Sequence, residues 1–275
     1  MTFDYQKSIW GKGLSDLKWS NPARFRLQQS LNAVKSLVQD ARVLELGCGA
    51  GRFISAVSSH RKDLQCYGCD ISESAIQTAK NRNDKVKFQL CASTLPYEDN
   101  FFDAVLIFDV LEHVDDPLLV LKEIHRVVKN RGIFYCFVPC ENDLFSMWRW
   151  LGVKKTWSRL TEKYAGHIQK FSRKQLIEII KQTGFRIRRI RYSEHIIGQL
   201  AGIGVFFAIA SSQLKKNKRS VQINNEEFIY NINQRNNFLF SFARKVINII
   251  INIESTIFCA LPSPNVHITS IKYED

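Results

Sequence analysis

The sequence lacks the features that define several common classes of protein. Its seven cysteines show no paired metal-site spacing, because Cys66-x-x-Cys69 stands alone, and zinc sites need a second such pair or histidines. Reduced, buried thiols are therefore expected. The N-terminus is polar and charged and has no apolar signal-peptide core, so we predict a cytoplasmic protein.

Acidic residues are scarce relative to basic ones. The chain has 26 Asp and Glu against 39 Lys and Arg, a formal net charge of +13. This balance favours an anionic partner, either nucleic acid or an acidic membrane surface, and a solvated basic face is the alternative. Hydrophobic content of 45% and charged content of 24% are typical of soluble globular proteins. At 275 residues the chain can form one large domain or one domain with an appendage.

A glycine-rich loop is the central motif. The strand predicted over 42–46 ends at a loop in which every second residue is glycine, at Gly47, Gly49 and Gly51. Glycine lets the backbone adopt positive φ and approach a ligand, and the amides that open the next helix face the loop. A dinucleotide fingerprint would need glycine where Arg52 stands. The spacing therefore disfavours a nicotinamide oxidoreductase.

A second predicted strand, over 64–69, ends at the acidic residue Asp70. In a doubly wound sheet, a carboxylate at this place can accept both hydroxyls of a ribose bound over the first loop. A helix cap is the alternative role for Asp70. A helix over 73–81 and a strand over 86–91 would complete a first βαβαβ half.

The motif Gly-x-Gly-x-Gly, preceded by Glu45, resembles motif I of the class I S-adenosylmethionine (SAM)-dependent methyltransferases. The resemblance continues in the family's order over about residues 40–192. The further matching segments are Ala92-Ser93-Thr94-Leu95-Pro96-Tyr97, Phe102-Asp103-Ala104-Val105, Leu111-Glu112-His113-Val114, Lys129-Asn130-Arg131-Gly132 and His167-Ile168-Gln169-Lys170-Phe171-Ser172. The last of these recurs in small-molecule and lipid-precursor methyltransferases, including the ubiquinone-pathway enzymes. Cys91 departs from the family, which usually has an aspartate there to accept from the adenine amino group, and a thiol is a poor acceptor.

The resemblance implies an α/β fold with a doubly wound, mostly parallel, seven-stranded Rossmann-like sheet and a helical, apolar insert before the last strand. We predict an N-terminal helical cap over 1–40, a SAM-binding core over 41–192, the insert over 193–265 and the last strand over 266–275. The resemblance also implies which residues bind SAM. They are Glu45, Gly47, Gly49 and Gly51 around the methionine moiety, Asp70 and Ile71 at the ribose and adenine face, Ala92 and Ser93 at the adenine edge, and Phe108 and Asp109 closing the methionine side.

Methyl transfer from SAM requires alignment of a nucleophile and exclusion of water, and we expect no metal. A base is needed where the acceptor is a hydroxyl or an amine. His167, before a helix of the expected lid, and His113, after the fourth strand, are the candidate catalytic residues. A structural role is the alternative for His113. Asp109 and Glu112 are expected to shape the methionine end of the site.

The insert contains two apolar segments, at 196–210 and 238–261, with a cationic run at 215–219 between them. Neither makes a comfortable spanning helix, since about 20 apolar residues are needed. Two helices that lie in the interface of an anionic membrane fit better, so we predict peripheral membrane contact through 196–261. Packing on each other as a soluble cap, or on a second chain in an oligomer, is the alternative.

These patterns together predict a SAM-dependent methyltransferase that acts on an O or N atom, or less readily a C atom, of a lipid, isoprenoid or other small molecule. Methylation of RNA is the alternative that the net charge of +13 raises. The lack of an Asn-Pro-Pro-Tyr-type motif after the fourth strand and of an RNA-binding module argues against a nucleic-acid partner. A third alternative is a non-catalytic partner subunit of the same fold, anchored to a membrane.

Overall fold

The computed structural model describes the whole chain except residues 1–8, 14, 92–93, 153, 217–237 and 274–275. Seven strands form one sheet in the order β3-β2-β1-β4-β5-β7-β6, and β7 is antiparallel to both of its neighbours. The strands are β1 (Arg42–Leu46), β2 (Gln65–Asp70), β3 (Lys87–Leu90), β4 (Phe102–Phe108), β5 (Val128–Pro139), β6 (Phe185–Ser193) and β7 (Asn265–Lys272). The predicted fold class is confirmed.

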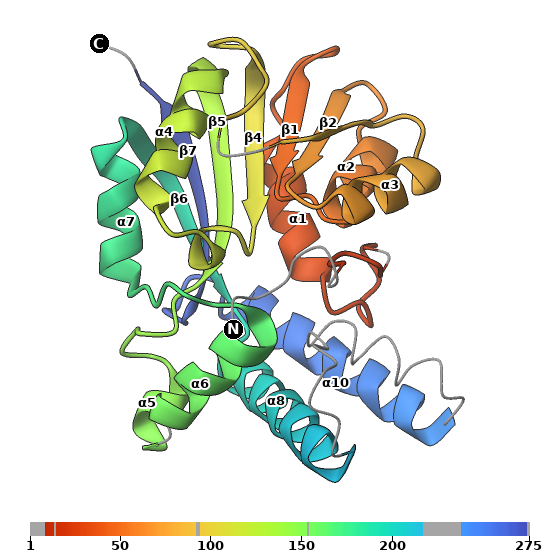
Figure 1. Ribbon diagram of the computed structural model, residues 1–275, viewed down its shortest axis with the longest axis vertical. Coiled ribbons are helices and arrows are strands. Elements are labelled where there is room, and N and C mark those ends of the chain that lie inside the picture. The colour runs from red at the N-terminus through yellow and green to blue at the C-terminus, as the bar shows by residue number, and fades with distance from the viewer. Residues whose placement is uncertain (1–8, 14, 92–93, 153, 217–237, 274–275) are drawn as a thin grey trace.

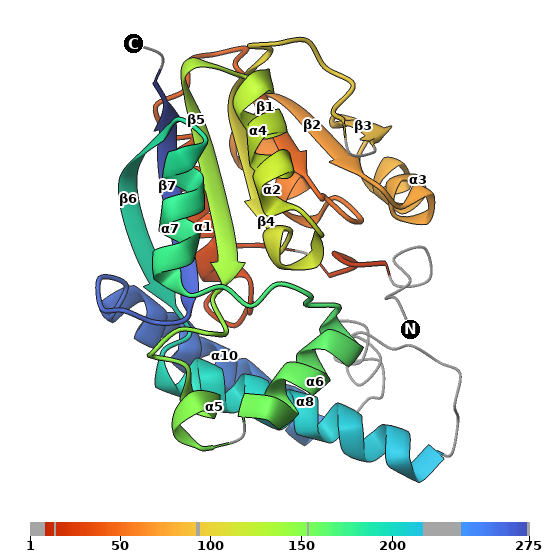
Figure 2. The same ribbon diagram turned by 60° about the vertical axis from the view of Figure 1, so that its left-hand side comes forward.

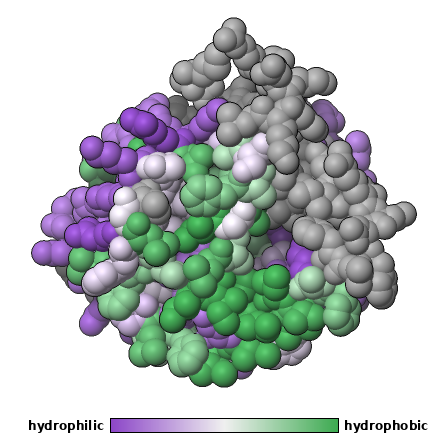
Figure 3. Space-filling model, turned by 90° about the horizontal axis from the view of Figure 1, so that it is seen from below, coloured by the Kyte–Doolittle hydropathy of each residue, from purple (hydrophilic) through white to green (hydrophobic). Residues whose placement is uncertain are grey.

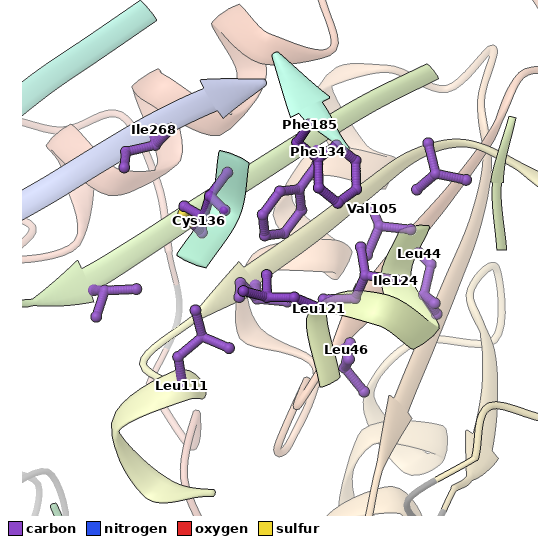
Figure 4. Packing of buried hydrophobic residues seen from close by; sticks show 14 of the residues in the cluster. Leu44, Leu46, Val105, Leu111, Leu121, Ile124, Phe134, Cys136, Phe185 and Ile268 are labelled. Carbon is purple, nitrogen blue, oxygen red and sulfur yellow. The ribbon is translucent and has the colours of Figure 1, made fainter. Parts of the chain in front are cut away.

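Helices cover both faces of this sheet, as Figure 1 shows. Those of the core are α1 (Arg24–Ala33), α2 (Arg52–His60), α3 (Glu73–Arg82), the short helix η1 (Leu111–His113), α4 (Pro117–Val127) and α7 (Arg173–Gln182). Side chains of α1, α2 and α3 pack with Ala104 and Leu106 on one face. Side chains of α4 and α7 pack with Val105 and Ile107 on the other face (Figure 4). The two clusters follow from the alternation of side chains along a strand.

Local signals in the sequence place several helix ends. The side chain of Asp116 accepts from the amides of Leu118 and Leu119, with Pro117 in the first turn of α4. Ser172 and Gln175, a Ser-x-x-Gln pattern in the sequence, form a capping box at the start of α7. Both caps satisfy amides that have no partner within the helix.

Two predicted boundaries differ from the structure. The apolar pattern of residues 23–38 predicts one helix, but the first core helix ends at Ala33. The polar residues Lys129-Asn130-Arg131-Gly132 predict a turn and a fifth strand that begins at Ile133. The strand instead begins at Val128, which pairs with Phe102. Arg131, with φ of 63°, carries the chain through the polar stretch that we expected to be a turn.

The remaining helices lie beyond the carboxyl ends of the parallel strands (Figures 1 and 2). They are α5 (Met147–Trp150), α6 (Lys154–Ala165), α8 (Ile196–Lys216) and α10 (Phe238–Ile257). Glu254 of α10 accepts from the amides of Ile196 and Ile197 at 2.9 Å each, which ties the two helices of the insert together. Within the described part of the chain, none of the helices meets the length and hydropathy of a membrane span.

Candidate SAM and acceptor site

The three glycines of the first loop adopt left-handed backbone conformations, with φ of 73°, 52° and 76°. A Cβ atom added at any of them would collide with another part of the protein. The added Cβ atom would lie 2.5 Å from Val110 Cγ2 at Gly47, 2.6 Å from the Trp10 carbonyl oxygen at Gly49 and 2.7 Å from Phe88 Cζ at Gly51. Glycine is therefore required here by the packing of the protein as well as by the backbone angle.

Asp70 joins the end of β2 to the glycine loop. Its Oδ2 accepts from the amide of Gly49 at 2.8 Å, and its Oδ1 accepts from the amide of Ser72 at 2.9 Å. Burial raises the pKa of this carboxyl, and the backbone hydrogen bonds oppose the rise. A carboxylate offers about four acceptor positions, which is more than its backbone hydrogen bonds use. Ser72, rather than Asp70, caps α3.

Glu45 is buried at the end of β1. Its Oε2 accepts from the amide of Ile54 at 2.6 Å, inside the first turns of α2. Burial raises the pKa of this carboxyl to about 8, although the Ile54 hydrogen bond opposes the rise. Glu45 thus holds β1 and α2 on either side of the glycine loop.

The raised pKa of Glu45 makes stability depend on pH. An unfolded glutamate has a pKa of about 4.3, so between that value and about 8 the folded state binds more protons. The free energy of unfolding must fall as pH rises through this window. We expect Glu45→Gln, which keeps an acceptor for Ile54, to gain stability relative to wild type as pH rises. Urea unfolding near both ends of the window measures this, and a pH-independent difference would contradict it.

One cavity of about 1060 Å³ runs from the glycine loop to the helices beyond the sheet. Most of the predicted site residues line it: Glu45, Gly47, Gly49, Asp70, Ile71, Phe108, Asp109, His113 and His167. Gly51 packs on Phe88 instead. Ala92 and Ser93 lie outside the described residues, so the adenine-edge contacts stay a prediction. Cys91 lines the cavity as a buried thiol, and all seven cysteines are free.

The two candidate catalytic histidines meet in the wall of this cavity. The ring centroids of His113 and His167 are 5.0 Å apart, with the rings edge to face. His113 Nδ1 donates to the carbonyl of Gly166 at 3.1 Å. Burial and the neighbouring His167 lower the pKa of His113 to about 3, so its imidazole is neutral at neutral pH.

Glu141 is a functional candidate that we did not predict. Its Oε1 accepts from His167 Nδ1 at 2.5 Å, and its Oε2 lies 3.0 Å from Lys170 Nζ. Burial opposes ionisation of Glu141, but His167 and Lys170 together lower its pKa. Thr161 donates to the same carboxylate at 3.0 Å. The position of Glu141 just after β5 could have identified it from the sequence, since ligands of such sheets bind outside the carboxyl ends of strands.

Arg26 of α1 is a second residue that we did not predict. Its guanidinium donates to Asp109 at 2.8 Å and to Glu194 at 3.3 Å, and it lies 3.9 Å from the ring centroid of Phe137. Asp109 itself has a φ of 52°. These partners come from three distant parts of the chain, and no local pattern identifies their meeting.

The strand order, the glycine loop and the acidic residues at the ends of β1 and β2 define a Rossmann-like, nucleotide-binding α/β protein. A family model described as a methyltransferase domain matches residues 44–136. Residues 44–136 therefore form a methyltransferase domain, and the cofactor of this class of domain is SAM. The site fits SAM, because Asp70 lines the cavity with acceptor positions to spare for ribose hydroxyls. When bound, SAM supplies a methyl group that its sulfonium makes electrophilic.

Several curated proteins are similar to this chain. An uncharacterised protein of Methanocaldococcus jannaschii is 28% identical over 62% of this chain and 76% of its own length. A ubiquinone/menaquinone biosynthesis C-methyltransferase of Desulfotalea psychrophila is 35% identical over 38% of this chain and 45% of its own. A 27-O-demethylrifamycin SV methyltransferase of Amycolatopsis mediterranei is 29% identical over 47% of this chain and 52% of its own. The chain thus spans about half the length of the two relatives with named activities.

Proposed function

We propose that this protein transfers the methyl group of SAM to an oxygen or nitrogen atom of a lipid, an isoprenoid or another apolar small molecule. The observation that carries the proposal is the continuous cavity of about 1060 Å³. A pocket for one drug-sized ligand measures about 300–1,000 Å³. The larger volume supports a cofactor and an acceptor held side by side.

The outer part of the cavity supports an apolar acceptor. Trp148 of α5 and Trp157 of α6 stack with ring centroids 4.1 Å apart, and Phe206 of α8 meets Trp157 edge to face. All three are buried and line the cavity. Gly198 and Gly202 also line the cavity and have no side chains that would fill it. Such walls bind an apolar body, and the few polar groups orient it.

His113 and His167 are among the polar residues of the cavity wall. We place the reacting group of the acceptor against His113 and His167, whose rings are oriented through Nδ1 by the Gly166 carbonyl and the Glu141 carboxylate. The named relatives support this class of acceptor, since one is a quinone-pathway enzyme and the other modifies a rifamycin. Their names include both C- and O-methylation.

Methyl-labelled SAM incubated with the protein and an extract of the source cells tests the proposal. We expect label in the fraction that organic solvent extracts, because the outer walls of the cavity are apolar. Label in RNA or in protein would contradict the proposed acceptor class. SAM binding without transfer to any fraction would instead favour a non-catalytic partner subunit.

The outer face of the insert supports contact with an anionic membrane. Large apolar side chains are exposed along two helices: Ile196, Ile197, Leu200 and Phe207 on α8, and Phe242, Val246, Ile247, Ile250, Ile253 and Ile257 on α10. Figure 3 shows that apolar residues gather on this side of the molecule. The net charge of +13 favours an anionic surface. Most of the predicted cationic run at 215–219 lies outside the described residues.

Removing apolar side chains from this face should weaken vesicle binding. Phe242 and Ile257 are 60% and 66% exposed, and burial of such a side chain contributes about 1.5–3 kcal/mol. We expect Phe242→Ser and Ile257→Ser each to lower partitioning onto phosphatidylglycerol vesicles by roughly tenfold or more. Val38→Ser is the control, because Val38 is 75% exposed outside the insert. Equal partitioning of all three variants in sedimentation would remove the membrane assignment.

A further inference from the structure

Three side chains that can ligate a metal meet beside the acceptor cavity. Glu112 and His113 come from η1, after β4, and His167 comes from the segment between α6 and α7. One ligand atom from each lies within 4.8 Å of the others. His113 and His167 line the cavity, and Glu112 lies in the protein behind them.

Glu112 is the unusual member of this group. It is 0% exposed, and neither of its carboxyl oxygens has a hydrogen-bond partner among the described residues. Its backbone carbonyl accepts from the amides of Ile168 and Gln169. Buried polar groups are nearly always hydrogen-bonded, and an unpartnered carboxyl must take up a proton or a cation. Burial and the nearby Asp109 raise the pKa of Glu112.

Both histidines are oriented by the ring nitrogen that a metal would not use. His113 donates through Nδ1 to the carbonyl of Gly166, and His167 donates through Nδ1 to the carboxylate of Glu141. Metal-ligating histidines almost always donate their second nitrogen to a carbonyl or a carboxylate in this way. The Glu141–His167 pair therefore has the form of a carboxylate–histidine–metal arrangement.

We propose that Glu112, His113 and His167 bind one divalent transition-metal ion of the Zn²⁺, Fe²⁺ or Mn²⁺ class. Two imidazoles and one carboxylate form a ligand set that suits these ions and leaves positions open. Ligand bonds of about 2.0–2.2 Å need the three atoms somewhat closer together than 4.8 Å, so the ligands close around the ion. No metal was expected from the sequence, because methyl transfer from SAM does not itself require one.

The role of the ion rests on the proposed methyl transfer. Its open positions would face the cavity through His113 and His167, where an acceptor oxygen can bind. A cation lowers the pKa of a bound hydroxyl, which eases loss of its proton to solvent. The overall change loses one proton from the acceptor, forms one oxygen–carbon bond and breaks one carbon–sulfur bond whose electron pair stays on sulfur. The ion is neither oxidised nor reduced.

Titration of the metal-free, tag-free full-length protein with Co²⁺ tests the site without any acceptor. We expect one ion per chain by calorimetry, with visible absorption bands of a coordinated ion. Glu112→Gln and His167→Gln should each weaken binding by at least about tenfold, and Glu141→Gln, which removes only the positioning carboxylate, by about 10–100-fold. His60→Gln is the matched control, because His60 is exposed on α2. Its affinity should equal that of wild type.

A second measurement separates loss of the site from loss of the fold. Glu112→Gln removes a buried carboxyl that has no hydrogen-bond partner among the described residues, so without metal it should unfold at the wild-type temperature or above. Absence of Co²⁺ binding to wild type, or equal binding to Glu112→Gln, would overturn the site. Full transfer activity in excess chelator, with SAM bound, would overturn its role and leave the proposed function standing. Metal binding without transfer to any fraction would support the site while the proposed function fails.

Discussion

Asp70→Ala is expected to lower the affinity for SAM by about 100-fold or more while the protein stays folded. We predict that this carboxylate accepts from the ribose hydroxyls, and a hydrogen bond to a charged group contributes about 1.5–3 kcal/mol. The substitution also removes the bond from the amide of Gly49, so the loop loses a support. Calorimetric titration with SAM measures the loss, and thermal unfolding checks the fold.

Two further variants sharpen this result. Asp70→Asn keeps one acceptor oxygen and should lose only about tenfold. Asp84→Ala, which removes an exposed carboxyl from the turn before β3, should bind SAM like wild type. Unchanged affinity in Asp70→Ala would show that the ribose lies elsewhere.

Gly202→Leu is expected to block the acceptor without affecting SAM. Gly202 lines the cavity on α8, and a Cβ atom there meets nothing within 4 Å. A leucine side chain would therefore extend into the space assigned to the acceptor. With the acceptor bound, the added side chain would overfill this space, and overpacking costs about 1–3 kcal/mol. We therefore expect kcat/KM for the acceptor to fall by about tenfold or more. The Kd for SAM should not change.

Gly204→Leu is the matched control on the same helix. Its Cβ also meets nothing within 4 Å, but Gly204 is exposed and does not line the cavity. Both changes remove a helix glycine and should stabilise α8 to a similar extent. Equal activity of the two variants would place the acceptor away from α8.

The core fold was predictable because its signals are local. The apolar strand at 42–46, the glycine loop and the helix at 52–60 occur at the predicted residues. The seventh strand was placed correctly despite the long insert before it, since Asn265–Lys272 is an apolar, β-branched stretch at the end of the chain. The start of β5 was missed because the polar residues at 129–131 read as a turn, and only the pairing of Val128 with Phe102 shows otherwise.

The residues of the site could be predicted only where a local sequence signal places them. Asp70 and the glycines lie where strand ends place them, and the structure brings His113 and His167 together as the two candidates in one wall. The Arg26–Asp109–Glu194 group depends on how α1, β4 and β6 converge. The lack of a hydrogen-bond partner for the Glu112 carboxyl among the described residues is likewise a property of packing, which periodicity and spacing do not encode.

The insert leaves and re-enters the sheet at a single point. Ser193, the last residue of β6, pairs with Asn265, the first residue of β7. Everything between them is thus a loop between neighbouring strands, and lengthening such a loop costs little entropy. The insert can therefore change in length while the pairing of β6 with β7 stays in place. If the insert selects the acceptor, as we propose, this connection lets acceptor preference change without a change in the order of the strands.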